Sequence, residues 1–391
     1  MANARVLFVD DEPLIREFYS MLGVILGPGY DIFVVGSAAE GLAFLQQTPV
    51  DIVVSDLVMP QMNGHEFMTQ VAREHPESMR IVLSAYEDQL TVAQCLMFGH
   101  RYMSKPFDLK QLATVLNRIC HLKHRLGGEN IKKIVSGLGA LPTPPRTYQR
   151  LTSALNSEFS SMQDVGDIIQ DDPGLTVKIL QIANSAYFGG GRRIVTPFDA
   201  VQLIGVEILR ALTLCVHAFK FYENVPFKNF SVSRLWDHSM DTAHGAQRLA
   251  KLEKLPRNRC DEAFVSGLLH DIGKLVMAGN ASEDYEIVIA RSAQGSVASE
   301  EVEKEVFGVS HAQIGAYLLG LWGLPDAIVN NVDMHHEPRA AADSTFTPLI
   351  AVHVAQCLHP SANRKKQLDV DYLSTIGLQG HIVDWESTLR N

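Results

Sequence analysis

The chain has 391 residues, of which 46% are hydrophobic and 20% are charged. This composition is typical of globular domains and excludes collagen, coiled coil and disorder as the main architecture. The 34 Lys and Arg residues against 44 Asp and Glu residues give a formal net charge of −10. An acidic chain without a long basic run argues against nucleic-acid binding, because phosphate contacts need clustered cations. The length predicts two or three domains, at about 150 residues each.

The cysteines and the N-terminus indicate the compartment. Five cysteines at wide spacings, with no Cys-x-x-Cys pair, argue against a disulfide framework and against a thiolate zinc site. The N-terminal sequence MANARVLFVDDEP lacks an apolar signal core, and no apolar run reaches the length of about 18 residues that a membrane span needs. We therefore expect a soluble, cytoplasmic protein that does not contact a membrane.

Residues 1–122 alternate short runs rich in Val and Ile with helical patterns. The expected strands are 6–9, 32–35, 52–55, 81–84 and 101–103. The expected helices are about 14–26, 38–47, 64–75, 88–98 and 108–122. Continuous apolar runs indicate strands that are buried on both faces, and their alternation with helices predicts a parallel sheet between helices. Ligands of such sheets bind at the carboxyl ends of the strands.

Polar residues follow those strand ends. Asp10 and Asp11 follow the first strand, Asp56 follows the third, Ser84 ends the fourth, and Lys105 follows the fifth. Packed carboxylates repel one another, so their pKa values would rise unless a cation sat among them. Hard oxygen ligands suit Mg²⁺, and a carboxylate beside Mg²⁺ can accept a phosphoryl group. Lys105 and the Ser84 hydroxyl would then hold the phosphoryl oxygens.

The segments VLFVDDEP, SDLVMPQMNG, IVLSAY and YMSKPF resemble the receiver domain of two-component response regulators, over the whole of 1–122. The resemblance implies a flavodoxin-like, five-stranded parallel sheet of order 2-1-3-4-5. It also implies a phosphodonor, which is a sensor histidine kinase or a phosphotransfer protein. The site residues that it implies are the phosphoacceptor Asp56, the Mg²⁺ ligands Asp10, Asp11, Asp56 and the Val58 carbonyl, and the phosphate-contact and switch residues Ser84, Lys105 and Tyr102. A half-buried strand aromatic is an equally good interpretation of Tyr102.

The pattern changes after the first domain. Gly127-Gly128 and Thr143-Pro144-Pro145 are stop and boundary signals, and we place a linker at 123–138. Long periodic apolar segments then predict an all-α domain over 139–360, followed by a C-terminal extension at 361–391.

Asp172-Pro173 and Thr196-Pro197 are expected helix starts. One helical face is expected to carry Val201, Ile204, Ile208, Leu212 and Cys215. Further helices are expected at 234–252, 259–277, 283–293, 298–307, 310–321, 325–334 and 345–358.

Histidines in the second domain form a series that could bind a metal. The candidate ligands are His238, His270, Asp271, His311, His335 and His336. Imidazole and carboxylate groups suit Zn²⁺, Fe and Mn²⁺. Adjacent helix residues point about 100° apart, so the His270-Asp271 doublet can flank one metal, or Asp271 can bridge two. Such a metal would activate water for attack on phosphorus, and Lys274 would steady an anionic substrate. For any single histidine, a backbone-bonded core residue or a helix cap is the alternative.

The segments IIQDDPGLTVKILQIANSAYF, AVQLIGVEILRALTL, GLLHDIGKL and HAQIGAYLLGLWGLP look like an HDOD domain, which is related to the HD superfamily of metal-dependent phosphohydrolases. HDOD domains are generally regarded as regulatory. The chain departs from the HD-GYP phosphodiesterases, because no Gly-Tyr-Pro follows His336 and Gln356 stands where the metal-site pattern has Asp. A neutral amide is a weaker ligand than a carboxylate, which argues against a binuclear centre and leaves a mononuclear one open.

Three functions remain open. In the first, phosphorylation of Asp56 in a phosphorelay controls how the helical domain binds a downstream signalling protein. In the second, the helical domain is a phosphorylation-gated phosphohydrolase that acts on a nucleotide or a cyclic dinucleotide. In the third, the degenerate site binds a nucleotide without cleaving it. The fourth helix, fifth strand and fifth helix of the receiver are expected to form either a homodimer surface or a dock for the helical domain.

Overall fold

The computed structural model describes two compact units, the first within Met1–Thr143 and the second built from Pro144–Leu319 and Leu324–Asn391. The described residues are 3–75, 78–84, 101–105, 110, 112–113, 115–117, 120, 146–156, 161–184, 194–222, 228–293, 297–322, 324–358 and 368–390. The expected helix at 88–98 and the expected linker at 123–138 lie outside these residues.

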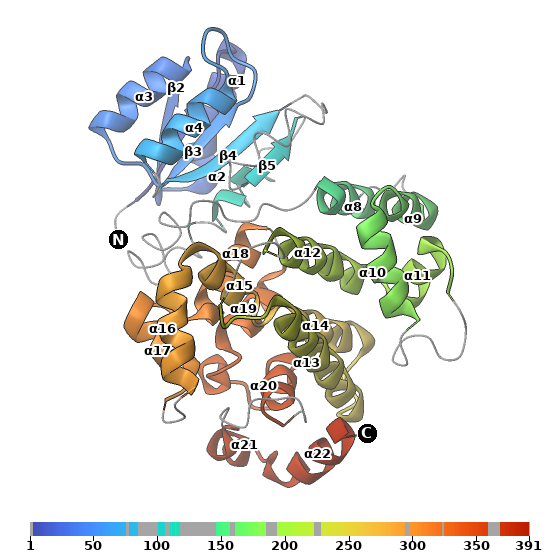
Figure 1. The fold of residues 1–391 in the computed structure, drawn as a ribbon. Coiled ribbons are helices and arrows are strands. Elements are labelled where there is room, and N and C mark those ends of the chain that lie inside the picture. Colours follow the sequence, from blue (N-terminus) through green and yellow to red (C-terminus); the bar gives the residue numbers. More distant parts are fainter. Residues whose placement is uncertain are drawn as a thin grey trace. The chain divides into compact units, whose positions relative to one another are not determined.

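A parallel sheet forms the centre of the first unit. Its strands are β1 (Ala4–Val9), β2 (Tyr30–Val35), β3 (Ile52–Asp56), β4 (Met79–Ser84) and β5 (Arg101–Ser104). They pair in the order β2-β1-β3-β4-β5, which confirms the predicted order (Figure 1). Nearly all residues of β1 and β3 are buried, as expected of strands that are covered on both faces. Val9 pairs with Ser55, so the next residues, Asp10 and Asp56, lie at the same edge.

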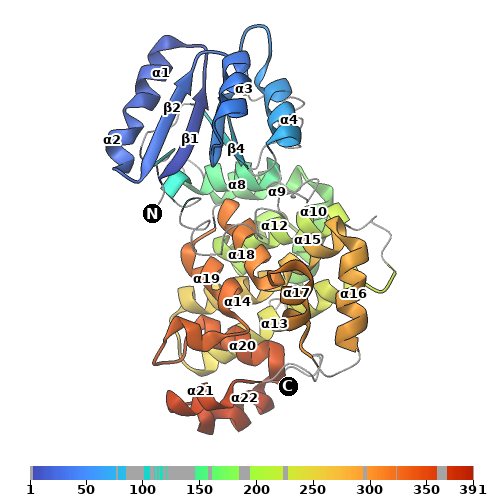
Figure 2. The same cartoon turned by 90° about the vertical axis from the view of Figure 1, so that its left-hand side faces the viewer.

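Helices cover both faces of this sheet. One face carries α1 (Pro13–Ser20) and α2 (Leu22–Leu26), and the other carries α3 (Ala38–Gln47) and α4 (Gly64–Glu74) (Figure 2). The predicted helix at 14–26 is therefore two helices, which meet at Met21. The described residues from 110 to 120 are helical, in agreement with the expected fifth helix.

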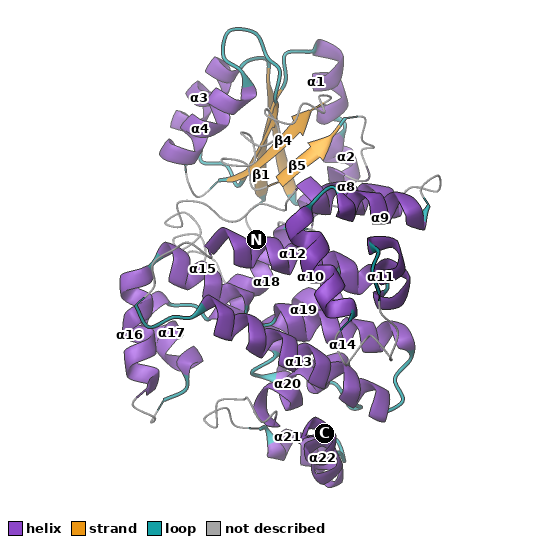
Figure 3. Ribbon diagram, turned by 45° about the vertical axis from the view of Figure 1, so that its right-hand side comes forward, coloured by secondary structure: helices purple, strands orange, loops and turns teal. Residues whose placement is uncertain are grey.

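All regular secondary structure in the described residues of the second unit is helical, which confirms the predicted all-α fold (Figure 3). Its α-helices are α8 (Arg146–Asn156), α9 (Met162–Gln170), α10 (Pro173–Ala183), α11 (Pro197–Ile204), α12 (Val206–Tyr222), α13 (Val232–Leu252), α14 (Arg257–Leu269), α15 (Ile272–Asn280), α16 (Ser282–Ala293), α17 (Ser299–Phe307), α18 (His311–Leu321), α19 (Asp326–Met334), α20 (Pro348–Leu358), α21 (Val370–Thr375) and α22 (Ile382–Arg390). Two short 3₁₀ helices lie at Pro338–Ala341 and Gln379–His381.

The predicted helix starts have side-chain caps. The Asp172 carboxylate accepts from the Leu175 N–H at the start of α10, and the Thr196 hydroxyl accepts from the Asp199 N–H at the start of α11. In both helices a proline follows the cap, where its missing N–H costs no hydrogen bond. These local signals are the reason why the helix starts could be predicted from the sequence.

A sharp bend interrupts the periodic segment after α11. Gly205 has a φ of 88°, which favours glycine, and α11 and α12 meet there at 116°. The residues expected on one face are nevertheless all buried: Val201, Ile204, Ile208, Leu212 and Cys215. Among the described residues no single helix has the length and apolar composition of a membrane span, and only the bent pair of α11 and α12 reaches them together.

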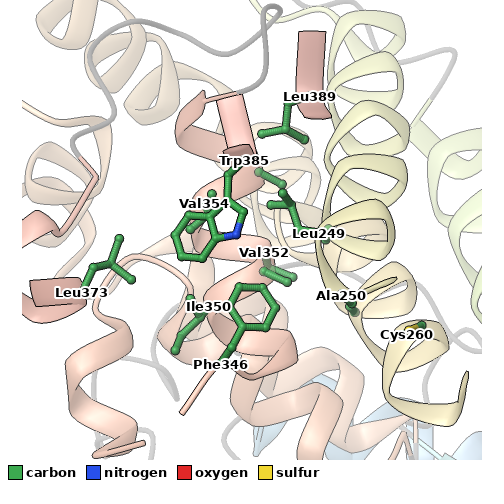
Figure 4. Packing of buried hydrophobic residues seen from close by; sticks show 14 of the residues in the cluster. Leu249, Ala250, Cys260, Phe346, Ile350, Val352, Val354, Leu373, Trp385 and Leu389 are labelled. Atoms are coloured by element: carbon green, nitrogen blue, oxygen red, sulfur yellow. The ribbon is translucent and has the colours of Figure 1, made fainter. Parts of the chain in front are cut away.

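The segment that we expected as a C-terminal extension contributes to the core of the second unit. Trp385 of α22 is fully buried, and its indole Nε1 donates to the Glu253 carboxylate at 2.7 Å. Figure 4 shows this ring among Phe346, which lies just before α20, Val354 of α20 and Leu249 of α13. The C-terminal helices therefore belong to the same apolar core as the central helices.

We predict that Trp385→Ala lowers the free energy of unfolding of the helical unit by about 3–5 kcal/mol, because it leaves a cavity and removes the bond to Glu253. The measurement is urea unfolding followed by far-ultraviolet circular dichroism. Val383→Ala on the same helix is the control, since Val383 is 76% exposed, and it should change stability by less than about 0.5 kcal/mol. Equal midpoints for the two variants would contradict the role of α22 in the core.

Candidate functional site

Three carboxylates meet at the carboxyl edge of the sheet. Asp10, Asp11 and Asp56 each offer an oxygen, and these oxygens lie within 4.8 Å of one another. Lys105 Nζ lies 2.8 Å from Asp56 Oδ2 and 3.1 Å from Asp10 Oδ2. Burial opposes the charge on Lys105, but its hydrogen bonds and charge contacts with Asp56 and Asp10 outweigh burial and raise its pKa. The structure thus brings together the acids and the lysine that the sequence indicated.

Hydrogen bonds orient two of these carboxylates. The Glu12 N–H donates to Asp10 Oδ1 at 3.0 Å, and the Tyr19 hydroxyl donates to Asp10 Oδ2 at 3.2 Å. Burial, with the charge of Asp10, raises the pKa of Tyr19, so the phenol keeps the proton that it donates. The Leu57 N–H donates to Asp56 Oδ1 at 2.6 Å. Both acids are therefore oriented before any ligand arrives.

The loop after Asp56 needs a glycine. A Cβ on Gly64 would stand 2.0 Å from the carbonyl oxygen of Asp56, so α4 can begin this close to the acid only with a glycine. Val58 lies in the same loop, and its side chain is 59% exposed. Ser84 ends β4 and Tyr102 lies in β5, but the side chains of both lie outside the described part of the chain.

The predicted metal ligands lie together in the helical unit, in two groups that share one carboxylate: His238, His270 and Asp271, and Asp271, His311, His335 and His336. Asp271 is fully buried. Its Oδ1 lies 3.1 Å from His311 Nε2 and 3.9 Å from His335 Nε2. Its Oδ2 lies 3.3 Å from His270 Nε2 and 3.6 Å from His238 Nε2. The two oxygens of one carboxylate therefore face two different pairs of imidazoles.

The His270-Asp271 doublet does not lie within one helix. The predicted helix at 259–277 is wrong here, because α14 ends before His270 and α15 begins after Asp271, whose φ and ψ are −102° and 8°. Asp271 points where this turn directs it, not where a continuous helix would. A Cβ on Gly273 would stand 2.0 Å from the His311 carbonyl oxygen, so this glycine allows α15 to approach α18 and bring Asp271 to His311.

Backbone carbonyls set the tautomers of two histidines. His270 Nδ1 lies 2.7 Å from the Gly267 carbonyl, and His335 Nδ1 lies 2.6 Å from the Val332 carbonyl. A carbonyl only accepts, so each Nδ1 carries a proton. Burial, with the charges of His270 and His311, holds the pKa of His335 well below its usual value, so His335 is neutral and its Nε2 presents a lone pair.

The surroundings of His335 Nε2 indicate whether the cluster suits a metal ion. This nitrogen is buried and has no hydrogen-bond partner among the described residues, and it faces a carboxylate oxygen at 3.9 Å. A lone pair that faces an anion is unfavourable unless a cation lies between them. Neutral imidazole with its Nδ1–H on a carbonyl is the form that metals bind. The donors present therefore fit a transition metal.

Two glutamates that the sequence analysis did not single out extend this site. Glu303 is fully buried, accepts from the His311 N–H at 2.8 Å and lies 2.6 Å from His311 Nδ1. Burial lowers the pKa of His311, but the charge of Glu303 and the hydrogen bonds with Asp271 and Glu303 together outweigh burial and raise it. His336 Nε2 lies 3.1 Å from His311 Nε2, and its Nδ1 lies 3.8 Å from Glu300 Oε2. No periodicity indicates the contact of Glu303 with His311, because it is made across the left-handed turn at Gly308.

The remaining predicted residues take distinct places. Lys274 Nζ donates to Asp271 Oδ2 at 2.7 Å. The Gln356 amide donates to the His335 carbonyl at 2.7 Å, and His353 Nδ1 lies 2.9 Å from the same carbonyl. Gln356 therefore anchors the backbone of His335. The sequence analysis considered Gln356 only as a weakened metal ligand and did not predict this structural role.

Comparisons with known proteins agree with this two-part architecture. The family model "HDOD domain" matches residues 141–338, just over half of the chain, and the model "Response regulator receiver domain" matches residues 6–117. An HDOD domain protein from Geobacter sulfurreducens is 22% identical, with a TM-score of 0.51, and the match covers 71% of this chain and 98% of that one. A putative phosphohydrolase from Shewanella amazonensis SB2B is 24% identical, with a TM-score of 0.52, and the match covers 68% and 94%. These two likenesses show the fold.

Among curated proteins, an uncharacterized protein from Treponema pallidum (strain Nichols) is 25% identical over 218 residues. The match covers 56% of this chain and 42% of the relative. The chain thus spans less than half the length of that relative.

We predict that Gly273→Ala lowers the free energy of unfolding by about 1–3 kcal/mol, because the added methyl group forces α15 away from α18. Thermal unfolding of the full chain measures the change. Gly380→Ala is the matched control, since a Cβ there would meet no atom within 4 Å. A Gly273→Ala protein as stable as the Gly380→Ala protein would contradict the close approach of the two helices.

Proposed function

The chain belongs to the HDOD domain family and carries a receiver domain, which makes it a signalling protein of the response-regulator type, and we propose that phosphorylation of Asp56 controls its helical unit. The observation that carries this proposal is the meeting of three carboxylates with Lys105 at one sheet edge. One lysine cannot balance three acids, so the cluster favours a divalent cation. The phosphodonor would be a sensor histidine kinase or a phosphotransfer protein, the usual partners of receiver domains.

The residues of the edge suggest how the transfer proceeds. An Asp56 oxygen forms a bond to phosphorus while the bond from phosphorus to the donor breaks. Asp10, Asp11, Asp56 and the Val58 carbonyl would hold Mg²⁺, which receiver domains generally bind and which neutralises charge on the phosphoryl group. Lys105 would then pair with a phosphoryl oxygen. In our proposal Ser84 contacts another oxygen, and Tyr102 follows it as a switch residue.

The added charge must reach the output unit. A phosphoryl group brings about −2 of charge at neutral pH, which changes the contacts at the sheet edge and biases any element with two arrangements. Membership of the HDOD family favours an output in which the helical unit binds a downstream signalling protein. The surface of β5 and its neighbouring helices remains our candidate for a homodimer contact or for a dock.

We predict that Asp56→Asn abolishes labelling by radioactive acetyl phosphate in the presence of Mg²⁺, because the amide is not a nucleophile. Asp31→Asn is the control, since Asp31 lies on β2 and its side chain accepts a hydrogen bond from Asn3. This variant should label as the unchanged protein does. Removal of Mg²⁺ with a chelator should also abolish labelling. Full labelling of Asp56→Asn would identify another residue as the phosphoacceptor.

The histidine cluster favours a second candidate function, the metal-dependent hydrolysis of a phosphoester under control of the receiver. The observation behind it is the buried, partnerless Nε2 of His335 facing Asp271. Asp271, His311, His335 and His336 offer four donor atoms within 4.8 Å of one another, and three of them would hold a catalytic Zn²⁺ ion with a water in the fourth position. Zn²⁺, Fe or Mn²⁺ there would lower the pKa of water. Glu303 would orient His311, and Lys274 would hold the anionic substrate.

We predict that the purified chain carries a transition metal and that His335→Ala weakens its binding at least about tenfold, measured by chelator competition and elemental analysis. His381→Ala is the control, because His381 pairs with Glu253 away from the cluster. Turnover of bis-p-nitrophenyl phosphate that disappears in Asp271→Ala would support hydrolysis. Bound metal without turnover would favour a regulatory or nucleotide-receptor role. A chain without affinity for metal would contradict the second candidate function.

A further inference from the structure

A pocket of about 490 Å³ lies in the helical unit, where the chain passes from α13 to α14. Two members of the histidine cluster lie at the other ends of these helices, since His238 belongs to α13 and His270 follows α14. Asp261 in the pocket lies nine positions before His270, and Gln247 lies nine positions after His238. At about 1.5 Å per residue, each separation is about 14 Å along the helix. The pocket is therefore distinct from the candidate metal site, and its volume lies in the range of small-molecule sites.

One wall of the pocket is apolar. Leu203 and Ile204 end α11, Ile208 belongs to the first turn of α12, and the 116° bend at Gly205 presents both helix ends to the pocket. Ile204 and Ile208 are buried, whereas Leu203 is 37% exposed at the rim. Aliphatic side chains on two helix ends form a surface against which a flat ring can pack.

The rest of the lining comes from α13, α14 and the turn between them, and beside Leu255 and Cys260 it carries more cations than acids. Lys251 and Arg257 lie there with one carboxylate, that of Asp261. Lys251 Nζ donates to Gln247 Oε1 at 3.4 Å, and Gln247 Nε2 donates to Asp261 Oδ1 at 3.1 Å. This chain of bonds orients the carboxylate beside the cations. In a chain with a net charge of −10, a pocket with a local excess of positive charge is suited to an anion.

The Asp261 carboxylate favours a ligand that carries a hydrogen-bond donor. Burial raises the pKa of Asp261, although the charge of Arg257 and the hydrogen bond from Gln247 oppose this effect. A carboxylate that burial disfavours is stabilised when a ligand N–H or O–H donates to it. The three features of the pocket, an apolar wall, two cations and an acceptor, together describe one class of ligand.

We propose that this pocket binds a small organic anion built on a flat ring, with the ring against Leu203, Ile204 and Ile208 and the anionic group on Lys251 and Arg257. An N–H donor on the ring bonds to Asp261. A nucleoside monophosphate and an amino-substituted aromatic carboxylate share this chemistry. The site lies outside the histidine cluster, and the proposal depends neither on that cluster nor on the phosphoacceptor.

Isothermal titration calorimetry of the full chain tests the proposal, with guanosine monophosphate and anthranilate as the two probes. The buffer contains EDTA, so that the result is independent of metal binding at the histidine cluster. We expect saturable binding of at least one probe, and the tighter probe identifies the anionic group as phosphate or carboxylate. Absence of binding by both probes at millimolar concentration would overturn the proposal.

Two variants locate the binding. Arg257→Gln should weaken the affinity about tenfold or more through loss of a charge-assisted hydrogen bond, and Leu203→Ala should weaken it severalfold. Both side chains are partly or fully exposed, so the variants should fold. Arg259→Gln is the control, because Arg259 lies on the same helix but pairs with Glu262 at 2.6 Å. Equal losses in the Arg257 and Arg259 variants, or no loss in either, would overturn the assignment of the ligand to this pocket.

Discussion

The charge of Asp271 has to be compensated without water, and the centre of the helical unit is arranged around that constraint. A fully buried carboxylate costs several kcal/mol unless cations or hydrogen bonds surround it. Lys274 lies one turn away on α15, whereas His311 and His335 belong to two other segments of the chain. These segments can face one carboxylate only if α15, α18 and α19 pack closely, which Gly273 allows. The close packing of these helices therefore assembles the cluster.

The buried carboxylates at the sheet edge of the receiver also need compensating charge, and there a lysine supplies part of it. Asp10 and Asp56 are buried and share the single ammonium of Lys105, so the edge keeps an excess of negative charge. The cluster around Asp271 also presents lone pairs and carboxylate oxygens to one another. In each unit the side chains are oriented by backbone groups before a ligand binds, as a site that binds a cation requires. The chain thus has two preorganised clusters of potential metal ligands, one made of carboxylates and the other of imidazoles around one carboxylate.

The agreement between sequence and structure depends on the range of the signal. The strands and the helix starts at Asp172 and Thr196 were predictable, because apolar runs and caps act within a few residues. The breaks at Gly205 and at the His270-Asp271 doublet were missed, since apolar periodicity continues through both. Glu303 was missed because its contact with His311 is made through a turn and not along a helix face.

By itself, the sequence determined the two fold classes, the strand order through family resemblance, and the residue types that gather in each candidate site. These properties follow from local spacing and from side-chain chemistry. Only the tertiary structure decided which atoms face one another: that the two oxygens of Asp271 meet separate pairs of imidazoles, and that Gln356 supports the His335 backbone. The physical reason is that these contacts join helices far apart in the chain, and their geometry is set by close packing, which no pattern of neighbouring residues encodes.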